Sequence, residues 1–365
     1  PEMARLLAKR LRRLGFNAVR LHQLDNYPGD SLTQPRSVLS TGAFPSFNEE
    51  AIRRLRALID ACRDEGIYIN LNLHVGYKFR PAIDQVSNLM PGMEMPYASH
   101  PFHIFDTRMQ ALQVDYARQL IRRLALRDEV ALAMVEINNE SSLIGAWQRR
   151  QLDKLSADYE RSLQALWQKW IARHYGSLEQ ACQLWQSCDL PRQGGLLVKA
   201  SEALQVERGS GFSAKLYNWG RRLWQKLDWQ LPQALQYHYQ MPEQGLARRV
   251  YDYAQFLVET DQHYTTLIAK TLRAELGHSV PITGTQMYFG GIANTLSQQN
   301  MDYLDEHFYV DHYQFPNKEW DSHDWRIRNH SVTRQGFISL LKRGWYRDMR
   351  KPFVISEYNQ AFPNQ

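Results

Sequence analysis

The chain has 365 residues, of which 44% are hydrophobic and 22% are charged. This balance is typical of a folded globular protein and excludes a disordered or collagen-like chain. No apolar run approaches the roughly 18 residues of a membrane-spanning helix, so the sequence predicts no membrane span.

The chain is slightly basic, because 44 Lys and Arg outnumber 38 Asp and Glu and give a formal net charge of +6. An excess of this sign can indicate a nucleic-acid partner. The basic clusters at residues 9–13 and 53–56, however, are interrupted by apolar residues at helical spacing. We interpret them as the solvated faces of amphipathic helices and expect no nucleic-acid partner.

Helices and strands alternate along the chain, and several predicted helices end at a glycine. Apolar residues between positions 3 and 14 trace a helical stripe that stops at Gly15, a residue type common just past helix ends. Ser46 and Glu49 predict a capping box at the start of the second helix. Later helices are expected at residues 106–124, 251–276 and 335–347. The predicted strands are residues 16–22, 67–74, 131–140, 280–288, 305–313 and 352–358.

This alternation predicts a parallel sheet covered by helices, either doubly wound or closed into a barrel. Polar side chains stand near the end of every predicted strand, as in a (β/α)₈ barrel, whose active site collects residues from the carboxyl ends of all its strands. No GxGxxG or GxxxxGK[ST] phosphate loop is present, although a doubly wound sheet usually has one after its first strand. We therefore predict an α/β fold, a (β/α)₈ TIM barrel that is incomplete at both ends because only its second to seventh strands fall within the chain.

Residues 148–250 interrupt the pattern and are too long for an ordinary loop between a strand and a helix. We predict a mostly helical insertion here, after the fourth strand, between a first part of the barrel at residues 1–147 and a second part at 251–365. Residues 159–185 are expected to form a helical pair within it. The insertion holds six tryptophans: Trp167, Trp170, Trp185, Trp219, Trp224 and Trp229. Their rings either pack a small helical subdomain or line a binding cleft.

Two glutamates carry the predicted chemistry. Glu140 ends the fourth strand of the expected barrel and Glu357 ends the seventh, so a closed barrel would point both carboxylates into one cavity. Paired carboxylates on either side of a glycosidic bond perform glycoside hydrolysis, because one protonates the leaving oxygen and the other attacks the anomeric carbon. The acid must stay protonated while the nucleophile stays ionised, so their surroundings must differ.

The run EINNE at residues 136–140, together with Glu357, resembles the retaining glycoside hydrolases of the (β/α)₈-barrel clan A, which includes cellulase-like, β-mannanase-like and β-galactosidase-like enzymes. That clan has an Asn-Glu pair after the fourth strand and a second Glu after the seventh. The resemblance implies that Glu140 is the acid/base and Glu357 the nucleophile. It also implies a β linkage and an oligo- or polysaccharide substrate.

The same resemblance assigns roles at other strand ends. Arg20 resembles the clan arginine that keeps the nucleophile ionised, with pairing to Glu136 as the alternative. His74 resembles a substrate-binding histidine, and Asn139 would contact the sugar 2-hydroxyl. The predicted substrate-binding or supporting residues are Arg20, His22, His74, Asn139, His307, Tyr309 and Tyr313.

The position of the nucleophile's tyrosine has two candidates. His307 and Tyr309 resemble the His-x-Tyr of the clan's sixth strand, whose tyrosine hydroxyl would hydrogen-bond the nucleophile. His312 and Tyr313, a few residues further along, are the alternative.

Other chemistries have less support in the sequence. A metal-dependent hydrolase usually needs a His-x-His after an early strand, and a serine hydrolase needs a GxSxG elbow; neither is present. We therefore expect no metal and no cofactor. A non-catalytic carbohydrate-binding protein on a degenerate barrel is the alternative function, and nucleic-acid binding ranks third. We expect an extracellular or periplasmic location, with any targeting segment lying before residue 1, and the sequence does not indicate an oligomeric state.

Overall fold

The computed structural model describes residues 1–185, 197–203, 244–277, 279–310, 312–318, 321–327, 341, 343–345 and 347–360. The chain divides into two compact units, one of Pro1–Ala146 with Leu257–Gln365 and the other of Trp147–Phe256. Among the helices of these described residues, none has the length and apolar character needed to cross a membrane.

Six strands are present in the described part of the chain, and every pairing between them is parallel. They are β1 (Ala18–Leu21), β2 (Tyr68–His74), β3 (Leu132–Asn138), β4 (Ile282–Thr283), β5 (Leu304–Val310) and β6 (Phe353–Gln360). The first four form one sheet in sequential order, and β5 pairs with β6. A parallel bridge between Gln286 and Asp305 lies between the two sets. This order lacks the reversal that defines a doubly wound sheet, as far as the described strands show.

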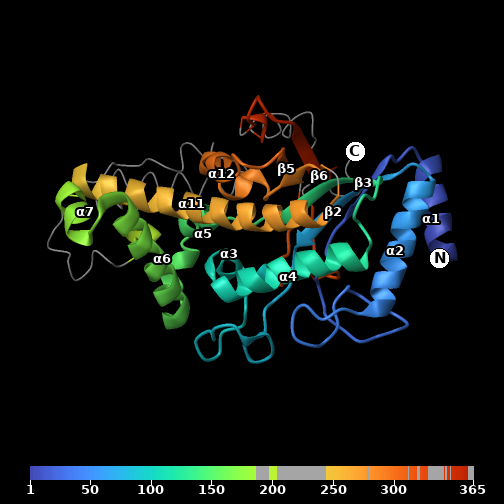
Figure 1. The fold of residues 1–365 in the computed structure, drawn as a ribbon, viewed down its shortest axis with the longest axis horizontal. Coiled ribbons are helices and arrows are strands. Elements are labelled where there is room, and N and C mark those ends of the chain that lie inside the picture. Colours follow the sequence, from blue (N-terminus) through green and yellow to red (C-terminus); the bar gives the residue numbers. More distant parts are fainter. Residues whose placement is uncertain are drawn as a thin grey trace. The chain divides into compact units, whose positions relative to one another are not determined.

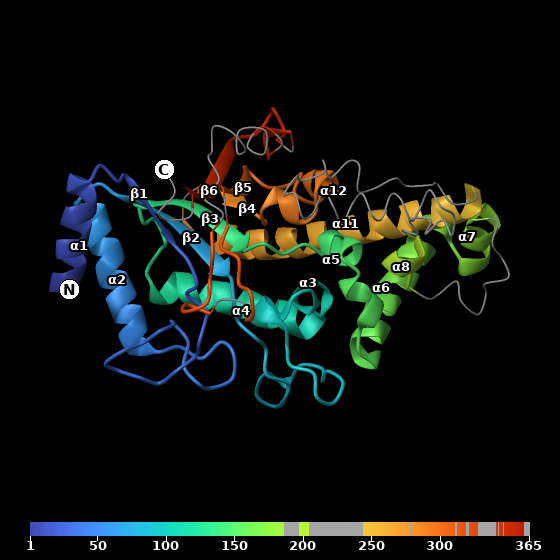
Figure 2. The same cartoon turned by 180° about the vertical axis from the view of Figure 1, so that it is seen from behind.

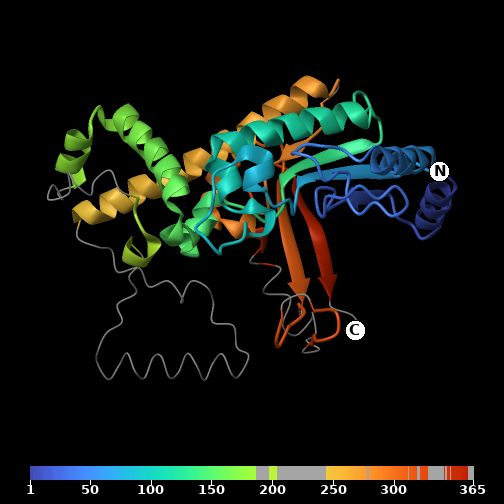
Figure 3. The same ribbon diagram turned by 90° about the horizontal axis from the view of Figure 1, so that it is seen from below.

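The strands curl instead of lying flat. In a flat six-stranded sheet β1 and β6 would be about 24 Å apart, because neighbouring strands are spaced by about 4.8 Å. Arg20 on β1 nevertheless contacts Glu357 on β6, with Nη1 2.5 Å from Oε1. Figure 3 shows β5 and β6 side by side and turned away from the direction of β2 and β3. The predicted α/β fold with parallel strands is confirmed, and its curvature brings the first and last described strands together.

Helices precede most of the strands along the chain. The long ones are α1 (Glu2–Arg13), α2 (Glu49–Asp64), α4 (Thr107–Arg123) and α11 (Gln244–Glu275). Figures 1 and 2 show α1 beside α2 and α4 alongside α11. The shorter ones are α3 (Phe102–Phe105), α5 (Leu143–Gln148) and α12 (Ile292–Ser297), with single turns at Pro81–Gln85, Tyr97–Ser99, Gln151–Lys154 and Met287–Phe289.

Helix α2 begins later than the capping-box pattern predicts. Asn48 is its N-cap, and the amide oxygen of this side chain accepts from the first backbone N–H groups of the helix. The predicted capping box at Ser46 and Glu49 is wrong, because Phe47 forms an antiparallel β-bridge with Leu39 just before the helix starts.

Helices α4 and α11 are tied to each other and to the sheet. The buried hydroxyl of Tyr264 on α11 lies 2.5 Å from Gln113 Oε1 on α4 and 3.0 Å from Asn138 Oδ1 at the end of β3. Near the other end of both helices, Arg122 donates two hydrogen bonds to Glu275. These contacts hold the helices against β3 and so fix the segment that follows it.

The second unit is helical in its described residues, which include α6 (Ala157–Tyr175), α7 (Leu178–Trp185) and α8 (Ala200–Ala203). The chain turns between the first two at Gly176, whose φ of +76° favours glycine. Trp167 stacks on Trp170 and on Trp185, with ring centroids 5.2 and 5.9 Å apart. All three rings are buried, so they pack the interior of this unit. The remaining tryptophans of the predicted insertion, Trp219, Trp224 and Trp229, lie outside the described residues.

Two differences in strand extent bear on the site. The strand predicted at 280–288 is reduced to β4, because the chain bends into the turn Met287–Phe289. The strand predicted at 352–358 extends to Gln360, so Glu357 lies inside β6 and not at its end. Most of the helix predicted at 335–347 lies outside the described residues.

Asp261 on α11 caps the start of α5 and makes stability depend on pH. Its carboxylate accepts backbone N–H bonds from Leu143 and Ile144 at 2.8 and 3.1 Å. Burial raises the pKa of Asp261 to about 7, although these bonds lower it. The folded protein therefore holds the proton more tightly than the unfolded chain, so this group makes the free energy of unfolding fall as pH rises from about 4 to about 7. We expect Asp261→Asn to flatten that slope in urea unfolding at a series of pH values, and an unchanged slope would contradict this role.

Candidate active site

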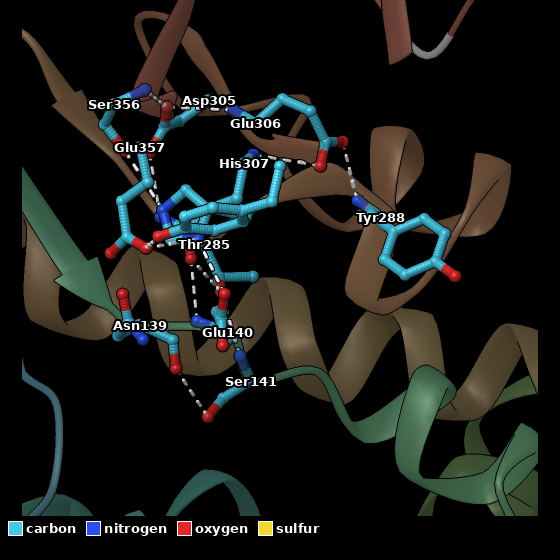
Figure 4. Close-up of polar contacts among 12 residues, drawn as sticks. Asn139, Glu140, Ser141, Thr285, Tyr288, Asp305, Glu306, His307, Ser356 and Glu357 are labelled. Carbon is cyan, nitrogen blue, oxygen red and sulfur yellow. Dashed lines mark hydrogen bonds and ion pairs between the residues drawn. The ribbon is translucent and has the colours of Figure 1, made fainter. Parts of the chain in front are cut away.

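Glu140, His307 and Glu357 meet at one place, although they come from separate segments. Glu140 follows β3, His307 lies on β5 and Glu357 lies on β6. One oxygen or nitrogen atom of each side chain lies within 4.8 Å of those of the other two. His307 Nδ1 is 2.6 Å from Glu140 Oε1 and 3.5 Å from Glu357 Oε2, so the ring bridges the carboxylates. Figure 4 shows these side chains converging.

Glu357 is held in its ionised form by its neighbours. Arg20 Nη1 donates to Oε1 at 2.5 Å, and the Tyr309 hydroxyl donates to Oε2. Burial by itself raises the pKa of Glu357, but the neighbouring His307 ring, the bond from Tyr309 and the charge of Arg20 together lower it below its usual value. A partly buried carboxylate that stays charged is suited to act as a nucleophile.

Arg20 is anchored by a second carboxylate beneath the site. Its Nε and Nη2 atoms donate to the two oxygens of Glu136 at 2.9 and 2.7 Å. Glu136 is fully buried and also accepts from Asn70 and Asn72 on β2. Both alternatives considered for Arg20, contact with Glu357 and pairing with Glu136, are therefore present in one geometry.

Glu140 stands in a different environment. Its backbone has a left-handed φ of +50°, a conformation that non-glycine residues seldom adopt and that often marks functional positions. The backbone N–H donates to Gln286 Oε1 at 2.7 Å, which pins the turn after β3 to the segment after β4. The side chain of Glu140 is 36% exposed, against 19% for Glu357, and Arg20 makes no ion pair with it in the described part of the chain.

A bulge in β6 aims two consecutive side chains at the cluster. Glu306 pairs with Ile355 and the next residue of β5, His307, pairs with Glu357, so Ser356 is the extra residue of β6. Successive side chains of a regular strand point to opposite faces, and a bulge removes that restriction locally. Ser356 Oγ is 3.1 Å from His307 Nε2 while Glu357 reaches His307 Nδ1.

Five of the predicted supporting residues surround the two glutamates. Arg20, His307 and Tyr309 make the contacts given above. Asn139 Oδ1 accepts from Arg20 Nη2 at 3.1 Å. His22 Nε2 lies 3.9 Å from Glu357 Oε1, and burial together with the Arg20 charge lowers the pKa of His22.

Two other predicted residues are placed differently. His74 is 3% exposed, with Nε2 3.0 Å from the Ala98 carbonyl and Nδ1 3.2 Å from Asp25. Tyr313 packs edge-on against Trp325, with ring centroids 5.0 Å apart. No hydrogen bond or ion pair joins either residue to Glu140 or Glu357 within the described ranges. His74 thus has a structural setting, and Tyr309, not Tyr313, bonds Glu357.

The predicted set omits three polar residues that support the site. Gln286 donates to Asp305 Oδ2 at 2.8 Å besides accepting from Glu140, and Ser356 donates to the same Asp305 oxygen at 2.6 Å. Alternation along β5 puts Asp305 on the same face as His307 and Tyr309, so this residue could have been found from the sequence. Ser356 could not, because only the bulge turns it inward.

The cluster also resembles a metal centre in composition, because three side chains of ligand types, two Glu and one His, have atoms within 4.8 Å of one another. Its hydrogen bonds do not favour a cation. Glu357 already accepts from Arg20 and Tyr309, and Glu140 shares a short bond with His307. A cation here would also face the fixed positive charge of Arg20. The donor set fits a hydrogen-bonded pair of carboxylates better than a metal site.

No protein-family model and no curated protein sequence matches this chain. Solved structures do resemble it. A β-galactosidase from the Antarctic haloarchaeon Halorubrum lacusprofundi aligns with a TM-score of 0.55 and 10% identity, over 100% of this chain and 52% of that one. The β-galactosidases from Marinomonas ef1 and Bacillus circulans sp. alkalophilus align with TM-scores of 0.46 and 0.45, each at 12% identity, over 84% and 87% of this chain and 39% and 38% of theirs.

At 10% identity the likeness to the haloarchaeal protein concerns the fold alone, and the chain spans about half of that protein's length. The parallel α/β architecture described above is therefore shared with part of a known β-galactosidase structure.

Proposed function

We propose that this protein is a retaining glycoside hydrolase. Glu357 attacks the anomeric carbon to form a covalent glycosyl-enzyme, and Glu140 first protonates the leaving oxygen and then activates water. The observation that supports this proposal most directly is that an oxygen of Glu140 lies within 4.8 Å of an oxygen of Glu357. Retaining enzymes hold the two carboxyl groups about 5 to 5.5 Å apart, whereas inverting enzymes leave about 6.5 to 9.5 Å for a water molecule.

The surroundings of the two carboxyl groups support this division of roles. Arg20 and Tyr309 stabilise the charge on Glu357, as a nucleophile requires. Glu140 is the more exposed of the two and its short contact is to His307, which can exchange a proton with it. Two carboxyl groups whose environments differ in this way are suited to acid and nucleophile roles.

We further propose that the strands belong to a (β/α)₈ barrel in which β1 to β6 are the second to seventh strands and residues 148–250 are an insertion. The sequential parallel order and the direct contact between Arg20 on β1 and Glu357 on β6 support a curved, closing sheet. The alignment with the haloarchaeal β-galactosidase supports the same architecture.

The substrate in this proposal is a β-linked oligo- or polysaccharide. Asn139 uses its amide oxygen to accept from Arg20, which leaves its NH₂ group to meet a sugar hydroxyl. The names of the similar structures make an aryl β-galactoside a reasonable first substrate.

The stereochemistry of the product tests the proposal. Hydrolysis of aryl β-glycosides, followed by ¹H NMR in the first minutes, should release the β-anomer before mutarotation. Initial release of the α-anomer would show inversion and contradict the roles given to both glutamates. Binding of glycans without hydrolysis across a broad panel would favour the carbohydrate-binding alternative.

Glu140→Ala should separate the two steps of the reaction. Loss of general acid catalysis should lower the rate on substrates with poor leaving groups by roughly 10²- to 10⁴-fold. On a dinitrophenyl glycoside, whose leaving group needs no proton, azide should restore turnover and yield a β-glycosyl azide, because the small anion attacks the glycosyl-enzyme without needing a base. The azide product is identified by NMR, and Glu140→Gln is the size-matched control. Full activity of Glu140→Ala, or no response to azide, would count against this role.

A further inference from the structure

A chain of hydrogen bonds leads from Glu140 into the interior of the sheet. Glu140 Oε1 is 2.6 Å from His307 Nδ1, and His307 Nε2 is 3.1 Å from Ser356 Oγ. Ser356 Oγ is in turn 2.6 Å from Asp305 Oδ2. Figure 4 shows the four side chains in this order, from the turn after β3 to the adjoining strands β5 and β6. Each link joins atoms that can both give and take a proton.

Asp305 at the inner end is a buried carboxyl group. It is 0% exposed, and its Oδ1 accepts the backbone N–H groups of Glu306 and Ser356. Burial and the nearby charge of Glu136 raise the pKa of Asp305 to about 6, against the lowering effect of its bonds from Gln286 and Ser356. The side chain can therefore hold a proton near pH 6, at a place that is closed to solvent.

We propose that Asp305 is a buried proton reservoir for Glu140, connected to it through the Ser356 hydroxyl and the His307 ring. The inference rests on the proposed function, because it concerns the acid form of Glu140. Asp305 is a positioning residue in this scheme, since it acts on the substrate only through the chain.

Proton transfer along the chain balances without any other reactant. The Ser356 hydroxyl donates to Asp305 Oδ2 when Asp305 is ionised and accepts from it when Asp305 is protonated. From the protonated form, Asp305 Oδ2 gives its proton to Ser356 Oγ, Ser356 gives its own proton to His307 Nε2, and His307 gives the Nδ1 proton to Glu140 Oε1. Asp305 ends ionised and Glu140 ends protonated, while Ser356 and His307 return to neutral forms with the imidazole in its other tautomer. The net charge of the four groups is the same before and after.

Substrate binding supplies the driving force for this transfer. Glu140 is 36% exposed in the free protein, so water stabilises its ionised form. A bound sugar would cover the carboxylate and remove that water, which favours the protonated form of Glu140. The proton then moves from Asp305 to Glu140, which acts as the acid in the first step. In the second step Glu140 must act as a base, and Asp305, now ionised, has no proton with which to neutralise it.

Other charges around the chain affect the same equilibrium. The titratable and charged groups that face it are Arg20, His22, Glu136, Tyr303, Glu306, Tyr309 and Glu357. Any test of the reservoir must therefore separate a proton path from a change of charge.

Two variants make that separation. Ser356→Ala breaks the path but leaves the charge of Asp305, and Asp305→Asn removes both. With an aryl glycoside of poor leaving group, the basic limb of the pH profile of kcat should move to lower pH by about one unit in each variant, with roughly tenfold lower kcat above pH 7. A dinitrophenyl glycoside needs no protonation of its leaving group, so its rate in the glycosylation step should change little. Ser356→Thr keeps the hydroxyl and should restore the wild-type limb.

Glu306→Gln is the matched control. Glu306 is the next residue on β5 and is equally buried, but its side chain points the other way, where Oε2 accepts from the Tyr288 backbone N–H at 2.9 Å. Glu306→Gln removes a buried carboxyl group beside His307 without breaking the path, so its basic limb should move less than that of Asp305→Asn. If the basic limb of the pH profile moves in Asp305→Asn but not in Ser356→Ala, the effect comes from charge alone and the proposed proton path is refuted. If kcat falls equally for both leaving groups at every pH, the variants have structural damage, and the proposed proton path is refuted as well.

A measurement without substrate keeps this inference distinct from the proposed function. ¹⁵N NMR of the His307 ring should show a changed balance of Nδ1–H and Nε2–H forms in Ser356→Ala, and a dependence on pH near 6 that is lost in Asp305→Asn. If no glycoside is hydrolysed, the proposed function fails, while these spectra still decide the path. Identical His307 spectra in the wild type and both variants would overturn the reservoir even in an active enzyme.

Discussion

Glu357→Ala should abolish glycoside turnover, with kcat lowered by roughly 10⁴-fold or more. The carboxylate that would form the glycosyl-enzyme is absent in this variant, and Arg20 and Tyr309 are left without the negative charge they stabilise. The fold should persist, because Arg20 keeps both bonds to Glu136. Single-turnover hydrolysis of an aryl β-glycoside measures the loss, and thermal unfolding checks that the variant is folded.

Azide distinguishes a missing nucleophile from a damaged site. In Glu357→Ala the anion can occupy the space of the lost carboxylate and attack the substrate directly, which yields the α-glycosyl azide. This product has the configuration opposite to that expected from Glu140→Ala, so the pair of variants assigns the two roles independently. Glu357→Gln, which keeps the size and loses the charge, should be inactive without azide. Substantial activity in a folded Glu357→Ala protein would refute the nucleophile assignment.

Arg20→Met should cost about 3–5 kcal/mol of unfolding free energy, because it leaves the fully buried Glu136 without its charged partner. The same change should move the acidic limb of the pH profile to higher pH. Arg20 is one of the groups that lower the pKa of Glu357, so without it the nucleophile stays protonated up to a higher pH. Urea unfolding measures the first effect, and the pH dependence of kcat/KM measures the second.

The double variant Arg20→Met with Glu136→Gln separates these two effects. Neutralising Glu136 should recover part of the lost stability, because the uncompensated buried charge is gone, but it should not restore the acidic limb. A matched single variant, Arg20→Lys, keeps the charge and should retain part of the effect on Glu357, although an ammonium group cannot bond both oxygens of Glu136 in parallel. A loss of less than about 1 kcal/mol in Arg20→Met would show that the buried pair contributes little.

Local patterns in the sequence were enough to predict the fold class and much of the site. Runs rich in aliphatic residues, each preceded by an amphipathic helix, identify β1, β2 and β3 within a few residues, because strands favour such side chains. The two glutamates stood out because each follows or lies in such a run. β4 was harder, since only two residues pair and the turn after it is decided by packing.

The sequence by itself determined that helices alternate with strands, that Glu140 follows a strand and that Glu357 belongs to one, because these features depend on neighbours along the chain. Only the tertiary structure decided which side chains meet. His74 carried the same sequence signal as His307, yet Asp25 and Ala98 enclose the first while the second bridges the glutamates. The bulge at Ser356 depends on how β6 pairs with β5, a register set by contacts between segments about fifty residues apart that no local pattern records.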